Sequence, residues 1–272
     1  MKIVIFISIL LGCWRSEASA QETSYLYPEG NTVQTRITLP EGYRRDSLPA
    51  ESFGAFLRNF PLEPHGAKVY FYNGTEKPKT VHVAVLKADV GKRDLQQCAD
   101  AVIRLRAEYL YGQKRYDELH FNFTNGFRAD YRKWADGNRI KVDGNRVSWY
   151  KAAEKDYSYR TFRAWLDCVF AYAGTLSLSK ELQSVPYSSL QAGDVLIQEG
   201  SPGHAVIVMD VAAGPHGKKL YLLAQSYMPA QSIHILKNPL SPSLSPWYEL
   251  SGEGAIPTPE WLFTSSDLKR FR

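Results

Sequence analysis

The sequence predicts an α+β protein in which two long helices pack against an antiparallel sheet. Residues 93–112 and 158–174 carry apolar residues at helical spacing and contain no Pro. Four short apolar runs between residues 194 and 237 are joined by short connections, which is typical of an antiparallel meander. No linker divides the chain, so we expect a single α+β domain over residues 21–272.

The N-terminal part is predicted from local patterns. Alternation of apolar and polar residues predicts strands at 32–40, 67–74 and 80–87. Residues 51–60 suit a short helix. In the long helix at 93–112, Asp94 is the expected N-terminal cap and Gly112 the expected end.

The segment between the two long helices is predicted to hold three small elements. These are a strand at 117–124, a short helix at 127–137 and a hairpin at 138–152 that turns at Asp143-Gly144.

The second long helix leads into the meander and the C-terminal tail. We expect this helix to end at Gly174. The four strands of the meander are expected at 194–198, 204–211, 219–227 and 232–237. From Asn238 onward the chain is rich in Pro and Ser, and we expect this tail to wrap the surface.

The first 20 residues have the layout of a secretory signal peptide. Lys2 precedes an apolar run, and Ala18-Ser19-Ala20 suits cleavage before Gln21. Leu10–Cys13 also resembles a bacterial lipoprotein signal, in which Cys13 becomes the lipidated first residue. We therefore expect export to the periplasm or beyond, either as a secreted protein or as a lipoprotein anchored at Cys13. No later segment is apolar enough to span a membrane.

Charge and motif content exclude several classes of function. The formal net charge is +5 and no Lys/Arg block occurs, so nucleic-acid binding is not expected. The chain contains no HExxH or CxxC motif, and its His residues lack metal-ligand spacing. We expect neither a metal nor a cofactor.

A series of short motifs runs from the second helix into the meander. It comprises Asp167-Cys168, Ala173-Gly174, Gly193-Asp194 and Gly203-His204. In this order, the segment 160–236 resembles papain-like cell-wall peptidases of the NlpC and CHAP type. The resemblance implies a papain-like core at about 158–237 and hydrolysis of peptidoglycan peptides or another amide.

The same resemblance suggests roles for three residues. Cys168 would be the nucleophile, His204 the general base and Gln225, on the next strand, the group that orients the imidazole. A thiol needs a neighbouring imidazole to become nucleophilic near neutral pH, and the imidazole needs a polar partner. The sequence departs from the family at Val169, where a small residue is usual. Cys168 also lies in mid-helix, away from the activating N-terminal dipole.

Cys98 leaves two alternatives open. It is expected one turn into its helix, a better place for activation, but its apolar neighbours favour core packing. A disulfide between Cys98 and Cys168 is also open. At the level of function, the alternatives are an inactive module that binds a wall peptide or glycan, and a structural envelope protein.

Five further residues are candidates for binding. Asp100 and Arg104, with Glu108, form a polar stripe that either lines a groove or makes a ladder of ion pairs. Polar and aromatic residues beside the Asn125-Gly126 turn suit a glycan or peptide contact, namely Asn125, Arg128 and Trp134.

The mature chain as a whole also resembles a family of secreted proteins of Gram-negative bacteria whose function is unknown. The segments QQCADAVIRLRAEYLYGQKRYDELHFNFTNG and LLAQSYMPAQSIHILKNP carry this resemblance. It implies an exported protein and no particular activity.

Overall fold

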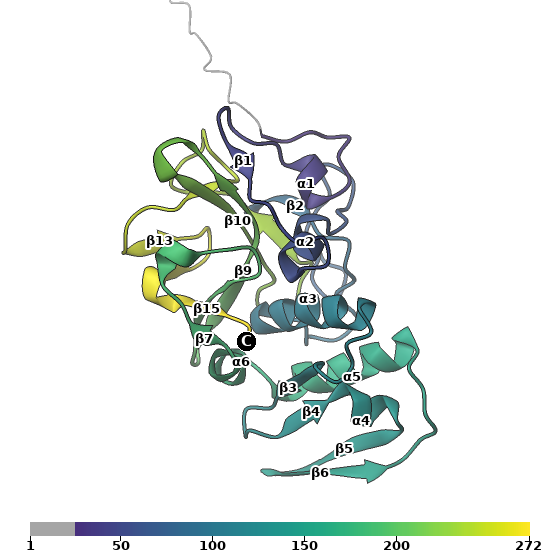
Figure 1. Cartoon of the computed structure of the whole chain (residues 1–272). Helices are drawn as coiled ribbons and strands as arrows, with labels where there is room; N and C mark the ends of the chain where they lie inside the picture. Colours follow the sequence, from purple (N-terminus) through teal and green to yellow (C-terminus); the bar gives the residue numbers. More distant parts are fainter. Residues whose placement is uncertain (1–24) are drawn as a thin grey trace, which may run out of the picture.

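An antiparallel sheet forms the centre of the computed structural model, which describes residues 25–272 (Figure 1). The predicted signal peptide and Cys13 lie outside these residues. The main path of the sheet runs β2 (His82–Val85), β11 (His234–Leu236), β10 (Lys219–Gln225), β9 (His204–Ala213), β8 (Val195–Gln198), β15 (Leu268–Arg270) and β7 (Gln183–Ser184). Strands β1 (Arg44–Arg45) and β12 (Tyr248–Glu249) pair with β9 and β10.

Strand β9 is buried on both faces, which explains its unbroken apolar sequence. Ala205 and Ile207 point into one hydrophobic cluster, together with the helices, whereas Val206 and Val208 point into a second cluster. The second cluster is completed by Phe263 and other residues of the tail. A strand covered on both faces has no polar face, so its sequence does not alternate.

Helices cover the first face of the sheet. They are α1 (Val33–Arg36), α2 (Phe53–Arg58), α3 (Cys98–Gly112) and α6 (Thr175–Glu181). Both α2 and α3 contact β9, and α3 also contacts β10. Figure 1 shows α3 running beneath the sheet.

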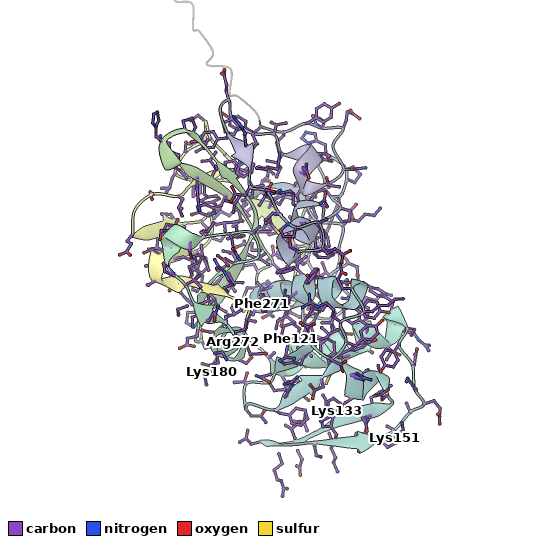
Figure 2. All side chains as sticks on the ribbon, in the orientation of Figure 1. Phe121, Lys133, Lys151, Lys180, Phe271 and Arg272 are labelled. Carbon is purple, nitrogen blue, oxygen red and sulfur yellow. The ribbon has the colours of Figure 1, made fainter. Side chains whose placement is uncertain are left out.

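A second layer lies on the side of α3 away from the sheet (Figure 1). Its elements are β3 (His120–Asn122), β4 (Arg128–Asp130), α4 (Tyr131–Ala135), β5 (Asn138–Asp143), β6 (Arg146–Lys151) and α5 (Tyr159–Tyr172). Tyr111 of α3 stacks on Phe162 of α5 with ring centroids 4.3 Å apart. Lys133 and Lys151 mark the outer part of this layer in Figure 2.

The sequence suggested that the tail only wraps the surface, but the tail also forms part of the core and of the sheet. It contributes β12, β13 (Ala255–Pro257), β14 (Leu262–Thr264) and β15. Trp247 and Phe263 are fully buried, and β15 lies inside the sheet between β8 and β7. The many Pro and Ser residues of this segment indicate turns, and they do not reveal that apolar residues between them are buried in the core.

The predicted α+β class, the four-stranded meander and the hairpin at 138–152 are confirmed. The strand predicted at 32–40 is wrong. It contains α1, where the Thr32 side chain accepts a hydrogen bond from the Thr35 amide and caps the helix. Residues 67–74 form only isolated bridges, and the segment 127–137 begins as strand β4 before α4. A short alternation of apolar and polar residues is compatible with both a strand and a capped helical turn, so it does not predict which of the two forms.

Candidate functional site

His204 and Gln225 meet where strands β9 and β10 lie side by side. His204 is the first residue of β9 and Gln225 the last of β10. His204 Nε2 donates a hydrogen bond to Gln225 Oε1 at 2.9 Å, and both residues are 1% exposed. The structure brings together two of the three residues to which the sequence assigned chemistry.

Three aromatic rings enclose the His204 imidazole. The ring centroids lie 4.8, 5.1 and 5.7 Å from that of His204 for Tyr227, Trp261 and Phe263, respectively. Burial lowers the pKa of His204 to about 4, although the bond to Gln225 and the charge of Glu260 both favour protonation. His204 is therefore a neutral imidazole at physiological pH.

A buried polar network lies behind Gln225. The Gln225 amide nitrogen donates to Glu260 Oε2 at 2.8 Å and lies 3.5 Å from His234 Nε2. Lys77 Nζ lies 2.7 Å from Glu260 Oε1, and the two charged side chains are only 6% and 12% exposed. Sequence reasoning missed Lys77 and Glu260, because both lie in turn-rich segments far along the chain from the meander.

Cys98 lies at the start of α3 and against the backbone of β9. The helix begins at Cys98 with Gln97 as its N-cap, so the expected cap at Asp94 is wrong. Asp94 Oδ1 instead accepts hydrogen bonds from the amide of Ala230 and the side chain of Gln97. The Cys98 Sγ lies 3.9 Å from the carbonyl oxygen of Gly203, the residue immediately before His204.

Two opposing effects act on the Cys98 thiol. Burial is the larger and raises the pKa of Cys98 to about 11, and the carboxylate of Asp100 acts in the same direction. The backbone N–H groups of Ala99, Ala205 and Cys98 itself lower this pKa. These amides place the sulfur where the unpaired N–H groups of a helix start meet the strand that carries His204.

Cys168, the predicted nucleophile, occupies a different setting. It lies in the middle of α5, where burial raises its pKa to about 11. Within residues 25–272 it forms no hydrogen bond with His204, and the aromatic neighbours of His204 do not come from α5. Cys98 and Cys168 are both free thiols, so the alternative disulfide is not formed. The thiol beside the His204 strand is Cys98, not Cys168.

A cleft of about 320 Å³ opens beside Cys98. Its wall includes Thr175 at the start of α6 and the β8–β9 turn that ends at Gly203. A side chain at Gly203 would place its Cβ 2.5 Å from Thr175 Oγ1 and 2.7 Å from the Gly200 carbonyl oxygen. The absence of a side chain at Gly203 therefore keeps the two walls of the cleft close together.

The polar stripe predicted on α3 is mostly internal. Arg104 is 3% exposed and donates to Glu108 Oε1 at 2.6 Å and to the Tyr159 hydroxyl at 3.0 Å. It therefore ties α3 to α5 instead of lining a groove. Asp100 is 5% exposed, accepts from the Gln97 amide at 3.1 Å and lines the cleft beside Cys98. Burial raises the pKa of Asp100 well above its usual range.

The other three binding candidates do not converge. Asn125 closes its own turn by accepting a hydrogen bond from the Phe127 amide. Arg128 pairs with Asp130 at 2.7 Å. Trp134 is 8% exposed and is covered by the Arg139 guanidinium, 4.4 Å from its ring centroid.

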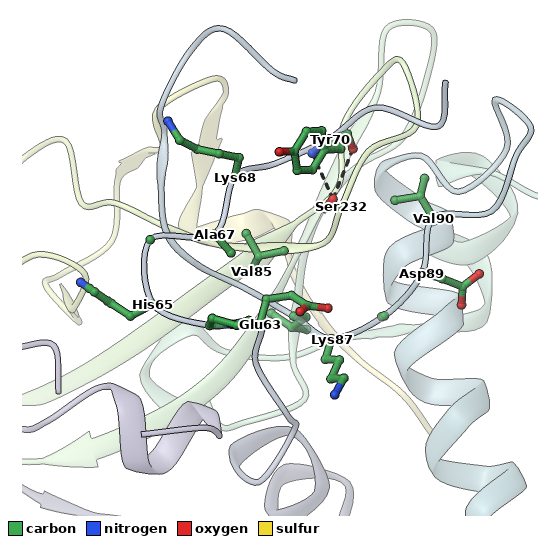
Figure 3. A pocket seen from close by; sticks show the side chains of 14 residues that line it. Glu63, His65, Ala67, Lys68, Tyr70, Val85, Lys87, Asp89, Val90 and Ser232 are labelled. Carbon is green, nitrogen blue, oxygen red and sulfur yellow. Dashed lines mark hydrogen bonds between the residues drawn. The ribbon is translucent and has the colours of Figure 1, made fainter. Parts of the chain in front are cut away.

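Other hollows lie away from Cys98 and His204, and two of them are larger than the Cys98 cleft and polar in part. The larger, about 730 Å³, is formed by the 63–70 loop, the end of β2 and Ser232 (Figure 3). Figure 3 shows that Ser232 is hydrogen-bonded to the backbone of Tyr70, while Lys68 extends away from the hollow. The second, about 420 Å³, lies near Phe121, Lys180 and Phe271 (Figure 2). Neither combines a thiol with an imidazole.

Among residues 25–272 no group of His, Cys, Asp and Glu side chains is arranged to hold a metal ion. Nor does any helix within these residues combine the length and apolar character needed to cross a membrane.

The fold and the buried cluster define an α+β protein with a thiol at a helix start and a His–Gln pair on the adjoining strands. Residues 33–270 match the family described as Domain of unknown function (4846), and the chain belongs to that family. This agrees with the resemblance of the whole chain to a family without known function. No curated protein and no solved structure matches the chain.

Proposed function

We propose that this protein is an exported cysteine amidase or peptidase with a papain-like core. Cys98 takes the role of nucleophile that the sequence assigned to Cys168, His204 is the general base and Gln225 orients the imidazole. The observation that carries the proposal is the position of the Cys98 sulfur, against Gly203 and Ala205 on either side of His204. This chemistry needs a thiol near an imidazole that a third group holds. Cys98 contacts the backbone on either side of His204, and Gln225 holds the His204 ring.

The proposed reaction uses Cys98, His204 and water. The thiol proton passes to His204 Nδ1 as the sulfur attacks the carbonyl carbon of an amide. The C–N bond then breaks, His204 returns the proton to the departing amine, and a thioester remains on Cys98. Water attacks this thioester while giving a proton to His204, the C–S bond breaks, and the proton returns to the sulfur as the carboxylic acid leaves.

The resting state in this mechanism is uncharged. Burial raises the pKa of the Cys98 thiol to about 11 and lowers that of the His204 imidazole to about 4, so burial disfavours a preformed thiolate–imidazolium pair. Proton transfer must therefore accompany the attack on the substrate. The unpaired N–H groups at the start of α3 are suited to stabilise the oxyanion that forms.

The cleft beside Cys98 is the proposed binding site for the substrate. Gly174, Gly200 and Gly203 line it, and Asp94 and Asp100 are its acidic residues. Peptides of the cell wall, which are the substrates implied by the NlpC and CHAP resemblance, are the proposed class. The predicted leader would deliver the protein to the compartment that holds them.

A second candidate follows from the same burial. Because burial holds both Cys98 and His204 in their neutral forms, the cluster also suits a module that binds a wall peptide without cleaving it. The two candidates differ in one measurable property, the formation of an acyl group on Cys98.

Acyl transfer from p-nitrophenyl acetate tests the proposal. We expect intact-mass and peptide mapping to find one acetyl group on Cys98, formed about 100-fold more slowly in the variant His204→Gln. The matched controls are Cys98→Ser, which should lose the modification, and Cys168→Ser, which should retain it. Equal rates in wild type and folded His204→Gln, or acetylation confined to Cys168, would reject the enzyme and favour the binding module.

A further inference from the structure

We infer that His234 and Glu260 are positioning residues that fix the orientation of the Gln225 amide and thereby leave Nδ1 of His204 as the proton acceptor. The inference rests on the proposed function for its consequence in catalysis, but its structural content is independent of it. Five groups form a chain of hydrogen bonds in which each partner dictates the polarity of the next.

The chain begins at a backbone carbonyl group. His234 Nδ1 lies 2.8 Å from the Ser232 carbonyl oxygen. A carbonyl oxygen only accepts, so Nδ1 must carry the hydrogen. His234 is fully buried, and burial lowers its pKa to about 3. The ring is therefore neutral, and its Nε2 presents a bare lone pair.

The Gln225 amide lies between two acceptors. One is His234 Nε2, 3.5 Å from the Gln225 nitrogen, and the other is Glu260 Oε2 at 2.8 Å. An amide turned by 180° would direct its oxygen at a carboxylate and leave its NH₂ group facing His204. The observed orientation is the one in which both acceptors receive a hydrogen.

The oxygen of this amide then determines the state of His204. Gln225 Oε1 lies 2.9 Å from His204 Nε2 and can only accept, so Nε2 carries the hydrogen of the neutral ring. Nδ1 keeps its lone pair, and within residues 25–272 it has no hydrogen-bond partner. In the proposed reaction it is the nitrogen that takes up the Cys98 proton.

Lys77 holds the last member of the chain in place. Its ammonium group donates to Glu260 and, at 2.9 Å, to Gln231 Oε1. The positive charge of Lys77 lowers the pKa of His204, whereas the charge of Glu260 raises it. The pair thus orients Gln225 while its two charges oppose each other in their effect on the imidazole.

The test reads the tautomer of His204 by ¹⁵N NMR, without any substrate. In the wild-type protein at pH 7 we expect a pyrrole-type signal from Nε2 and a pyridine-type signal from Nδ1, assigned by their loss in His204→Gln. A hydrogen on Nδ1 would overturn the inference, whether or not the protein is an enzyme.

Two variants distinguish an effect of the hydrogen-bond chain from an effect of packing alone. Lys77→Met/Glu260→Leu removes the ion pair without leaving a lone buried charge, and we expect His204 to show both tautomers and Cys98 acetylation to slow at least about tenfold. His82→Phe is the matched control. The buried His82 ring lies 5.8 Å from that of His234, but its hydrogen bond goes to the Ala67 carbonyl oxygen, which is not part of the hydrogen-bond chain. It should keep the wild-type tautomer.

The outcomes distinguish the two proposals. A mixed tautomer in His82→Phe, or a single tautomer in folded Lys77→Met/Glu260→Leu, would overturn the positioning role. The expected tautomers without any acetylation of Cys98 would support the hydrogen-bond chain and reject the amidase.

Discussion

Arg270 of β15 donates two hydrogen bonds to the buried carboxylate of Asp194, from Nε at 2.6 Å and from Nη2 at 2.8 Å. Asp194 is fully buried and belongs to the Gly193-Asp194 motif that contributed to the resemblance to peptidases. In this protein its carboxylate ties the tail to the start of β8.

Loss of this pair should destabilise the fold. Arg270→Met leaves the Asp194 carboxylate buried without its partner, and we expect the free energy of unfolding in urea to fall by about 3 kcal/mol. Arg146→Met is the control, because Arg146 and its partner Asp143 are 88% and 65% exposed. That change should cost less than about 1 kcal/mol. Similar losses in both variants would contradict the prediction.

Glu181 should make the protein less stable as the pH rises. Burial raises its pKa from 4.5 to about 7, against the opposing effects of the Asn122 amide and Arg128. Because the folded protein holds this proton more tightly than the unfolded chain, the free energy of unfolding should fall between pH 4.5 and 7. The effect is at most about 3 kcal/mol and is reduced by solvent screening of its exposed part.

Glu181→Gln should remove this pH dependence. Urea unfolding of both proteins at pH 5 and pH 8 measures it. If the free energy of unfolding changes equally between pH 5 and pH 8 in the wild type and in the variant, Glu181 is ionised in the folded protein throughout this range.

His204 should make the protein sensitive to acid. Its pKa falls from 6.5 to about 4 in the folded protein, so the unfolded chain takes up the proton first. Its contribution to stability is complete above pH 6.5 and is lost toward pH 4, by about 3 kcal/mol. His204→Gln should flatten the unfolding free energy over this range, and an unchanged slope would contradict the assignment.

Trp261 should keep water from His204. Its indole lies 5.1 Å from the imidazole and is held by a hydrogen bond of 2.9 Å from Nε1 to Gln198 Oε1. Because burial is the main cause of the low pKa of His204, Trp261→Ala should raise that pKa toward 6.5, and Trp261→Phe should raise it less. An NMR pH titration measures both. An unchanged pKa in the alanine variant would assign the burial to the other rings.

The meander and its His–Gln pair could be predicted because their signals are local. The apolar run of β9 predicts a buried strand, and Gln225 follows on the next strand. The proposed nucleophile could not be chosen in the same way. Cys98 begins its helix, but Leu95 extends the apolar pattern upstream, and Gln97 carries no sequence signal as a cap. A start at Asp94 therefore looked equally suitable.

The parts of the site that come from the tail had no local signal. Glu260 and Trp261 reach His204 only because β15 enters the sheet beside β8, a pairing between segments far apart in the chain. Pro and Ser around them indicate turns, and turn signals do not say which strand a segment will meet.

The order of synthesis gives this tail a particular significance. When residue 237 has been made, the nascent chain already holds Cys98, His204 and Gln225, yet it lacks the carboxylate that orients the amide and the indole that covers the imidazole. Those two groups follow later in the chain, with β15, which lies in the sheet between β8 and β7. The proposed site therefore cannot be complete until residues 260 and 261 have been made.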